Sequence, residues 1–211
     1  SIAGLLHVLP RLLKLPAGDN KFYQRLLDAT PPLPVKNGRI VPAQKYKDER
    51  RNFENPELYA LWPFRVAGPL AAATFQARIE KASIGWQYDG QCAAIAGLAD
   101  EAQQLLLGKI ANSNPAYRFP AMWGPNYDWL PDQDHGSNIL LTLQHMALQT
   151  HGDKIHVLPA WPKDWDISFK LHAPRKTVVE CVYRAGKIRK LKVTPAARRK
   201  NVHVINHETL Y

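Results

Sequence analysis

The sequence has few cysteines, no long apolar run and none of the short motifs typical of common enzyme chemistries. Cys92 and Cys181 are its two cysteines. They form no CxxC pair, are too few for a disulfide framework, and are most simply small buried apolar residues. No apolar stretch approaches the ~18 to 20 residues that cross a bilayer, so we expect no membrane span. GxSxG, phosphate-loop and dinucleotide motifs are absent too, so acyl transfer, phosphoryl transfer and nicotinamide chemistry lack support and no cofactor is expected.

A metal site is not expected either. The histidines of the second half that come closest to a ligand pattern have spacings of 10, 6 and 5 residues, which fit no HExxH-like motif. These residues are His135, His145, His151 and His156.

The composition is that of an ordinary globular protein with a sizeable core. The 211 residues are 45% hydrophobic and 22% charged, which argues against disorder. The opening stretch 2–15 is apolar but lacks a small-residue cleavage site, so it does not resemble a signal peptide. Because the sequence opens with Ser1 in an apolar helical pattern, we expect it to be a piece of a longer protein.

The positive charge is concentrated at the C-terminal end. From Leu171 onward there are ten Lys or Arg against two Glu, which accounts for +8 of the net charge of +10. Such a segment indicates either a surface that binds anionic polymers or the solvated face of a β-hairpin, where basic side chains also protect strand edges. Only one aromatic residue, Tyr183, is interleaved with these charges and no recognition motif is present. We therefore favour the solvated face, and no nucleic acid is expected as a partner.

The hydrophobic pattern predicts helices up to about His151 and strands after it. Helices are expected at 2–15, 21–29, 55–64, 68–82, 89–98, 100–111 and 136–150, with a small hairpin at Asn37-Gly38. Strands are expected at 154–158, 167–172, 177–184, 187–193 and 201–205, with a tight turn at Ala185-Gly186. The sequence thus predicts an α+β protein whose units are an array of helices, 1–152, and an antiparallel β domain, 153–211.

The expected helices differ in how much of their surface is apolar. The segment 92–99 is small and apolar nearly all round, and the helix at 136–150 is also wrapped by apolar residues. The helix at 100–111 has a one-sided stripe of Ala102, Leu105, Leu106 and Ile110. Helices that are apolar all round thus alternate with helices that have one apolar face, and the connections between them are short. This pattern predicts a two-layer α/α array.

The connection 117–136 is the best candidate for a site, because a long aromatic-rich loop between helices is usually functional. Aromatic rings can pack on the C–H faces of a sugar, while carboxylates and amides bind its hydroxyl groups. The alternative is a loop that merely closes the end of the helical array. The candidate side chains here are Trp123, Asn126, Tyr127, Trp129, Asp132, Asp134 and His135.

Asp134 has two competing roles. It stands just before the helix expected from Gly136, where it is a good N-cap, and it is also the candidate general base, with Asp132 as the substitute. Other candidates precede earlier helices. If the buried helices point the same way, these residues converge on one mouth: Glu57, Trp62, Trp86, Asp89, Asp132 and Asp134.

Five segments, in this order, resemble the C-terminal part of glycoside hydrolase family 95, the α-L-fucosidase and α-L-galactosidase type, or a close relative. They are Pro-Pro-Leu-Pro-Val-Lys-Asn-Gly-Arg-Ile (31–40), Asn-Pro-Glu-Leu-Tyr-Ala-Leu-Trp-Pro-Phe (55–64), Asp-His-Gly (134–136) with His-Met-Ala-Leu-Gln-Thr-His-Gly (145–152), and Ile-His-Val-Leu-Pro-Ala-Trp-Pro (155–162). The resemblance implies the last helices of an (α/α)6 toroid followed by a β domain. It also implies a secreted or periplasmic protein that acts on an oligo- or polysaccharide.

The resemblance further implies inverting hydrolysis with Asp134 as the general base. The family's general-acid Glu and its Asn helpers lie upstream of the residues present here, in the missing N-terminal part of the same protein. Where family members carry a substrate-binding His, this sequence has Glu57, so the sugar is left open. Two alternatives remain: a non-catalytic carbohydrate-binding or scaffold piece, and an anionic-polymer binder that acts through the basic C-terminal segment.

Overall fold

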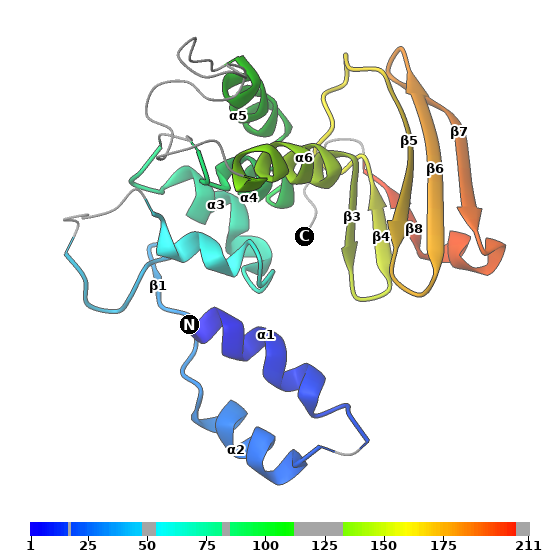
Figure 1. The fold of residues 1–211 in the computed structure, drawn as a ribbon. Helices are drawn as coiled ribbons and strands as arrows, with labels where there is room; N and C mark the ends of the chain where they lie inside the picture. The colour runs from blue at the N-terminus through cyan, green and yellow to red at the C-terminus, as the bar shows by residue number, and fades with distance from the viewer. Residues whose placement is uncertain (17, 48–53, 82–84, 112–132, 206–211) are drawn as a thin grey trace. The chain divides into compact units, whose positions relative to one another are not determined.

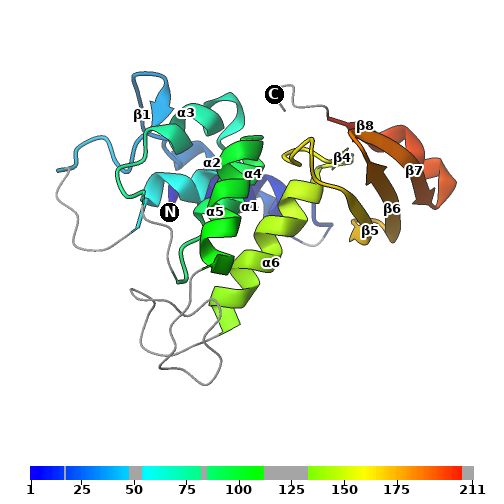
Figure 2. The same cartoon turned by 90° about the horizontal axis from the view of Figure 1, so that it is seen from above.

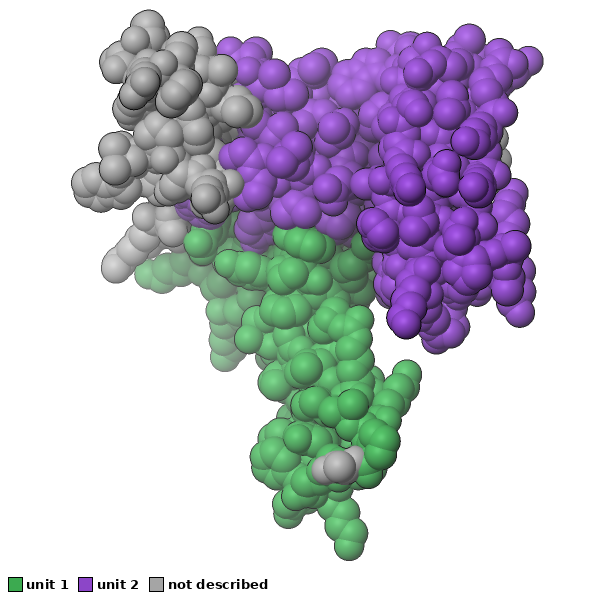
Figure 3. All heavy atoms as spheres, turned by 45° about the vertical axis from the view of Figure 1, so that its right-hand side comes forward, with its two compact units in different colours: residues 1–82, 211 green, residues 83–210 purple. Residues whose placement is uncertain are grey.

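The computed structural model describes residues 1–16, 18–47, 54–81, 85–111 and 133–205. It is an α+β protein (Figure 1). Residue contacts group the chain into two compact units, 1–82 and 83–210, coloured separately in Figure 3, and each unit is described by itself below. The expected division at 152/153 into a helical portion and a β domain stays a prediction. No described helix is long and apolar enough to cross a membrane.

Unit 1 consists of short helices and one small hairpin. The helices are α1 (Ile2–Leu12), α2 (Asn20–Ala29) and α3 (Ala71–Gln76), with the 3-10 turns η1 (Pro56–Ala60) and η2 (Gly68–Leu70). The predicted hairpin at Asn37-Gly38 is confirmed: β1 (Val35–Lys36) pairs with β2 (Arg39–Ile40), and both turn residues have positive φ. This conformation is the one that Asn-Gly favours.

The helix predicted at 55–64 is wrong in length and in its cap. The structure has only the five-residue turn η1 there, and the side chain of Asn55 makes no capping bond. Instead, its amide Nδ2 donates to the Glu80 carbonyl at 2.8 Å, and the Glu80 N–H donates to its Oδ1 at 3.1 Å. The amide is therefore used to pair with the main chain of Glu80. The helix predicted at 68–82 is also shorter, since α3 ends at Gln76.

Unit 2 contains three helices, α4 (Asp89–Ile95), α5 (Ala99–Ala111) and α6 (Gln133–Ala147). Every residue of α4 is buried, as the sequence predicted. Along α4, Gly90 faces Thr142 of α6, and the Ala94 carbonyl accepts from Gln149, which follows α6. Residue numbers thus rise together along both helices, so α4 and α6 run parallel. The short turn around Gly97, which has a φ of 76°, reverses the chain between α4 and α5 (Figure 2).

The exposed surfaces of α5 and α6 differ from the prediction. The buried stripe of α5 is Ala99, Ala102, Leu106 and Lys109, whereas Ile110 is 46% exposed. On α6, Leu140 is 60% exposed, so this helix is not buried all round in the chain as it stands.

The change from helix to strand occurs earlier than expected. The predicted helix 136–150 ends at Ala147, and Leu148–His151 forms β3, which pairs antiparallel with β4 (Lys154–Val157). The reason is Gln149: its side-chain Nε2, rather than its backbone N–H, donates to the His145 carbonyl at 2.9 Å. The Ala147 carbonyl instead accepts from the Leu158 N–H at 2.8 Å. Gln149 of β3 and Leu158, which follows β4, thus satisfy carbonyls at the end of the helix.

Two three-stranded sheets and the 3-10 turn η3 (Ala196–Asn201) make up the rest of the described part of unit 2. In one, β4 lies between β3 and β8 (Val202–Val204), which it pairs in parallel. In the other, β6 (Thr177–Arg184) lies between β5 (Ile167–Ala173) and β7 (Lys187–Thr194), all antiparallel (Figure 1). The predicted turn is confirmed, because Ala185 and Gly186 both have positive φ between β6 and β7.

The predicted alternation along β6 is confirmed as well. Thr177, Val179, Cys181 and Tyr183 are buried, and the residues between them are more exposed. Burial raises the pKa of the Cys181 thiol to about 11. This cysteine therefore stays a protonated thiol at neutral pH, as expected of a small core residue.

The close approach of α4 and α6 depends on Gly90, and this can be tested. A Cβ at this position would lie 2.8 Å from Thr142 Oγ1 and 2.9 Å from Thr142 Cγ2. We expect Gly90→Ala to lower the free energy of unfolding by about 1–3 kcal/mol, because the helices must move apart. Gly108→Ala is the matched control, since nothing lies within 4 Å of a Cβ there and alanine favours the helix by up to about 1 kcal/mol. Urea titration measures both variants; equal or opposite effects would contradict the close contact.

Candidate functional site

Several predicted site residues lie outside the described residues. Asp132 and four candidates of the preceding loop, Trp123, Asn126, Tyr127 and Trp129, belong to the segment 112–132. The backbone of Asp134 and His135 is described, but their side chains are not. The helix begins at Gln133, so Asp134 lies in its first turn, and the prediction that it caps a helix starting at Gly136 is wrong.

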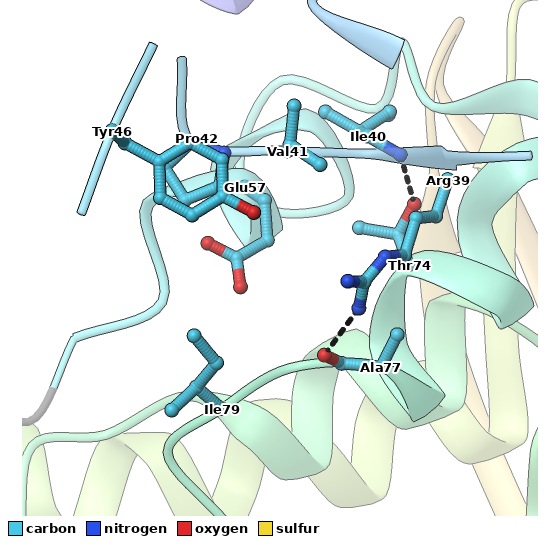
Figure 4. A pocket seen from close by; sticks show the side chains of 9 residues that line it. All are labelled: Arg39, Ile40, Val41, Pro42, Tyr46, Glu57, Thr74, Ala77 and Ile79. Carbon is cyan, nitrogen blue, oxygen red and sulfur yellow. Dashed lines mark hydrogen bonds between the residues drawn. The ribbon is translucent and has the colours of Figure 1, made fainter. Parts of the chain in front are cut away.

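Glu57 and Trp62 belong to unit 1. Glu57 is 5% exposed and lines a cavity together with Arg39, Tyr46 and Thr74 (Figure 4). The cavity wall is held by two hydrogen bonds, from Arg39 Nη1 to the Ala77 carbonyl at 2.8 Å and from the Ile40 N–H to Thr74 Oγ1 at 3.0 Å. Its volume of about 10 Å³ holds about one water molecule. A sugar ring does not fit this cavity as it stands, and substrate binding by Glu57 and Trp62 stays a prediction.

Trp86 and Asp89 belong to unit 2, at the N-terminal end of α4. Asp89 is the first residue of the helix and is 3% exposed, while Trp86 is half-buried in the segment before it. Because α4 and α6 run parallel, this end of α4 faces the same way as the start of α6, but it lies beside Asn138 and Thr142, five and nine residues after Gln133. The backbone of Asp134 lies about one helical turn before Asn138.

The segment before α4 is held by side chains from both neighbouring helices. Lys109 of α5 donates from Nζ to the carbonyls of Gly85, at 3.0 Å, and Gln87. Asn138 of α6 donates from Nδ2 to the carbonyl between them, that of Trp86, at 2.6 Å. Three consecutive main-chain acceptors are therefore satisfied by only two side chains, and we call this arrangement the carbonyl clamp.

Gln91 extends the carbonyl clamp into α4. Its Nε2 donates to Asn138 Oδ1 at 2.5 Å, so the amide of Asn138 connects α4 to the Trp86 carbonyl. Thr142, one turn further along α6, donates its hydroxyl to the Asn138 carbonyl at 2.7 Å. The polar groups at this end of the helices form a connected network, and such networks fix side-chain orientation.

Sequence reasoning missed Lys109, Gln91 and Asn138. Lys109 has a detectable pattern, because it continues the spacing of Ala99, Ala102 and Leu106 at positions where a helix faces the core. Gln91 is a polar residue in a helix that is otherwise small and apolar. No pattern distinguishes Asn138 from a surface residue.

The chemistry available at this end of the helices is that of amides, a carboxylate and an indole. Such groups bind hydroxyl-rich ligands. Among the described residues, no three His, Cys, Asp or Glu side chains form a group that could hold a metal ion. A comparison with family models and with curated proteins finds no match for this chain.

The carbonyl clamp predicts a local effect of removing Lys109. Lys109 is 6% exposed, and Lys109→Met leaves the Gly85 and Gln87 carbonyls without their donor. We expect the free energy of unfolding to fall by about 1–3 kcal/mol and amide hydrogen exchange at 85–91 to accelerate. Leu106→Ala, on the same buried stripe, is the control: it creates a cavity that costs about 2–5 kcal/mol but leaves the clamp in place. In each variant, exchange at 85–91 is compared with exchange in the rest of unit 2. If Leu106→Ala accelerates exchange at 85–91 selectively and Lys109→Met does not, the clamp is refuted.

Proposed function

We propose that this chain is part of an inverting exo-glycoside hydrolase that removes a terminal sugar from an oligo- or polysaccharide in the periplasm or outside the cell. In this proposal the chain supplies the general-base side of the site, and the general acid comes from upstream sequence. L-Fucose and L-galactose are the sugars that the resemblance implies, and Glu57 leaves the choice of sugar open. The proposal rests on the segments quoted above and on the arrangement of α4, α5 and α6.

The order of the three helices supports an α/α toroid. A wholly buried helix, α4, is followed by an antiparallel helix with one buried face, α5, and then by α6, which runs parallel to α4. This is the arrangement that adjacent inner and outer helices of a toroid require. The observation that carries the proposal is that α4 and α6 run parallel, with Asn138 of α6 bonded to the Trp86 carbonyl just before α4, because inner helices that run the same way in a toroid surround a common mouth.

The candidate base occupies a suitable position along α6. Asp134 precedes Asn138 by four residues, which is about one helical turn, so both lie on one side of α6. Asn138 is the residue that connects α6 to Gln91 and to the Trp86 carbonyl. The backbone of Asp134 therefore lies about one turn before the residue that bonds the Trp86 carbonyl. An inverting enzyme needs its base and acid ~6.5–9.5 Å apart, with water between the base and the sugar.

Substitution of Asp134 tests the proposal in the full-length protein encoded by the gene. We expect Asp134→Asn to lower the turnover of an aryl α-L-fucoside or α-L-galactoside by about 10²–10⁴-fold, because an amide cannot accept the proton of the attacking water. Folding should be preserved, since Asn is nearly the same size. Asp132→Asn distinguishes the two candidate bases: it should retain most activity if Asp134 is the base and lose it if Asp132 is. Wild-type turnover in Asp134→Asn would end the assignment.

A second candidate function is binding of an anionic polymer on the open face of the β5–β6–β7 sheet. In the register of the three strands, Lys170, Glu180 and Lys192 lie opposite one another, and Lys190 adds a third lysine. A hydrogen bond from Lys190 is the main cause that lowers the pKa of Glu180, and the charges of Lys192, Lys190 and Lys170 add to it. One carboxylate thus faces three lysines, and the face keeps a net positive charge.

Salt dependence separates the candidates. Binding of heparin to the sheet face should weaken steeply as the salt concentration rises, with a linear log–log slope. Binding of L-fucose or L-galactose at the helix ends should be nearly insensitive to salt. Saccharide binding without hydrolysis by the full-length protein would instead support the non-catalytic carbohydrate-binding alternative.

A further inference from the structure

Gln91 is a fully buried amide whose two polar atoms are used unequally. The side chain is 0% exposed in a helix whose other residues are small and mostly apolar. Its Nε2 donates to Asn138 Oδ1. Its Oε1 is buried and accepts no hydrogen bond from any residue that the structure describes.

The orientation of the Gln91 amide is dictated by its neighbours. The Trp86 carbonyl can only accept, so Asn138 must turn its Nδ2 toward it. Asn138 Oδ1 then faces Gln91, and this acceptor requires the Nε2 of Gln91. Exchanging the two ends of the Gln91 amide would bring two acceptor oxygens together. The hydrogen bonds that link the Trp86 carbonyl, Asn138 and Gln91 therefore direct Oε1 away from Asn138.

A buried acceptor of this kind requires a donor. A buried oxygen that accepts no hydrogen bond costs free energy comparable to a lost hydrogen bond. Natural proteins satisfy nearly all such groups with protein, with ordered water or with a ligand. Gln149 shows how an amide is satisfied within unit 2 itself: it is 3% exposed, and its Nε2 donates both to the Ala94 and to the His145 carbonyl.

We propose that Gln91 Oε1 is a binding group for a hydroxyl donor where the first turn of α4 packs against Asn138 of α6. The donor is either a bound water molecule or a hydroxyl group of a saccharide, both of which offer the same O–H. Asn138, about one turn after Asp134, lies between Gln91 and the Trp86 carbonyl in this chain of hydrogen bonds. The saccharide as a source rests on the proposed function; the hydroxyl donor itself does not.

A crystal structure of the wild-type chain, free and soaked with L-fucose, tests the proposal directly. We expect an oxygen of water within hydrogen-bond distance of Gln91 Oε1 in the free crystal, and a sugar hydroxyl or the same water in the soaked crystal. A donor from the protein itself at Oε1, or no donor at all, would overturn the proposal. Water in both crystals supports the binding group and counts against the sugar-binding function, so the two failures are distinguishable.

Titration with L-fucose measures the contribution of the amide in solution. We expect Gln91→Met to weaken L-fucose binding at least about tenfold, which corresponds to about 1.4 kcal/mol. The matched control is Gln149→Met, which removes a buried amide bonded within the protein and should leave the Kd within about twofold. Equal weakening in both variants would mean that the effect is structural, and would overturn the saccharide as the donor. The crystals of the wild-type chain decide the question independently of how well either variant folds.

Discussion

The arrangement of unit 2 depends on a backbone constraint: the three consecutive carbonyls of residues 85–87 are satisfied by side chains rather than by helix or sheet. Lys109 and Asn138 supply these donors from two different helices. Because a buried carbonyl without a donor is costly, moving either helix would break a bond to the same short segment. The carbonyl clamp therefore fixes the approach to α4 and, with it, the positions of Trp86 and Asp89.

Close packing of α4 against α6 makes the carbonyl clamp possible. Gly90 allows α6 to approach until Thr142 occupies the space of a missing Cβ, and the short reach of Asn138 then suffices to meet both Gln91 and the Trp86 carbonyl. Small residues bring the helices together, and polar residues at one end define their register. The polar residues gather where the first turn of α4 meets Asn138 of α6, about one turn after Asp134. Packing and the candidate chemistry are thus linked at one place in the fold.

The parts of the fold that sequence reasoning predicted are those in which local pattern decides the structure. Alternation along 177–184 and the turn at Ala185-Gly186 were enough to predict β6, its turn and its buried face. The errors occur where a bond to a distant residue overrides the local pattern. Gln149 lies in a helical pattern, but its side chain bonds the Ala94 carbonyl of α4. Asn55 is a residue type that often caps helices, but here its side chain bonds the main chain of Glu80. Likewise, Trp86 and Asp89 could be proposed for the site from sequence, but the burial of Lys109 follows from carbonyls about 22 to 24 residues earlier in the chain.

The most direct test of this account is a double-mutant cycle between Lys109→Met and Asn138→Ala, measured as free energies of unfolding. The two side chains do not bond to each other in the clamp; they hold adjacent carbonyls of the same segment. If both donors hold the segment 85–87 jointly, losing one donor already frees the segment. The loss of the second donor then lowers the free energy of unfolding by less, so the account predicts a coupling free energy of about 0.5 kcal/mol or more. Effects that add within about 0.3 kcal/mol would show that the two residues act independently and would contradict the carbonyl clamp.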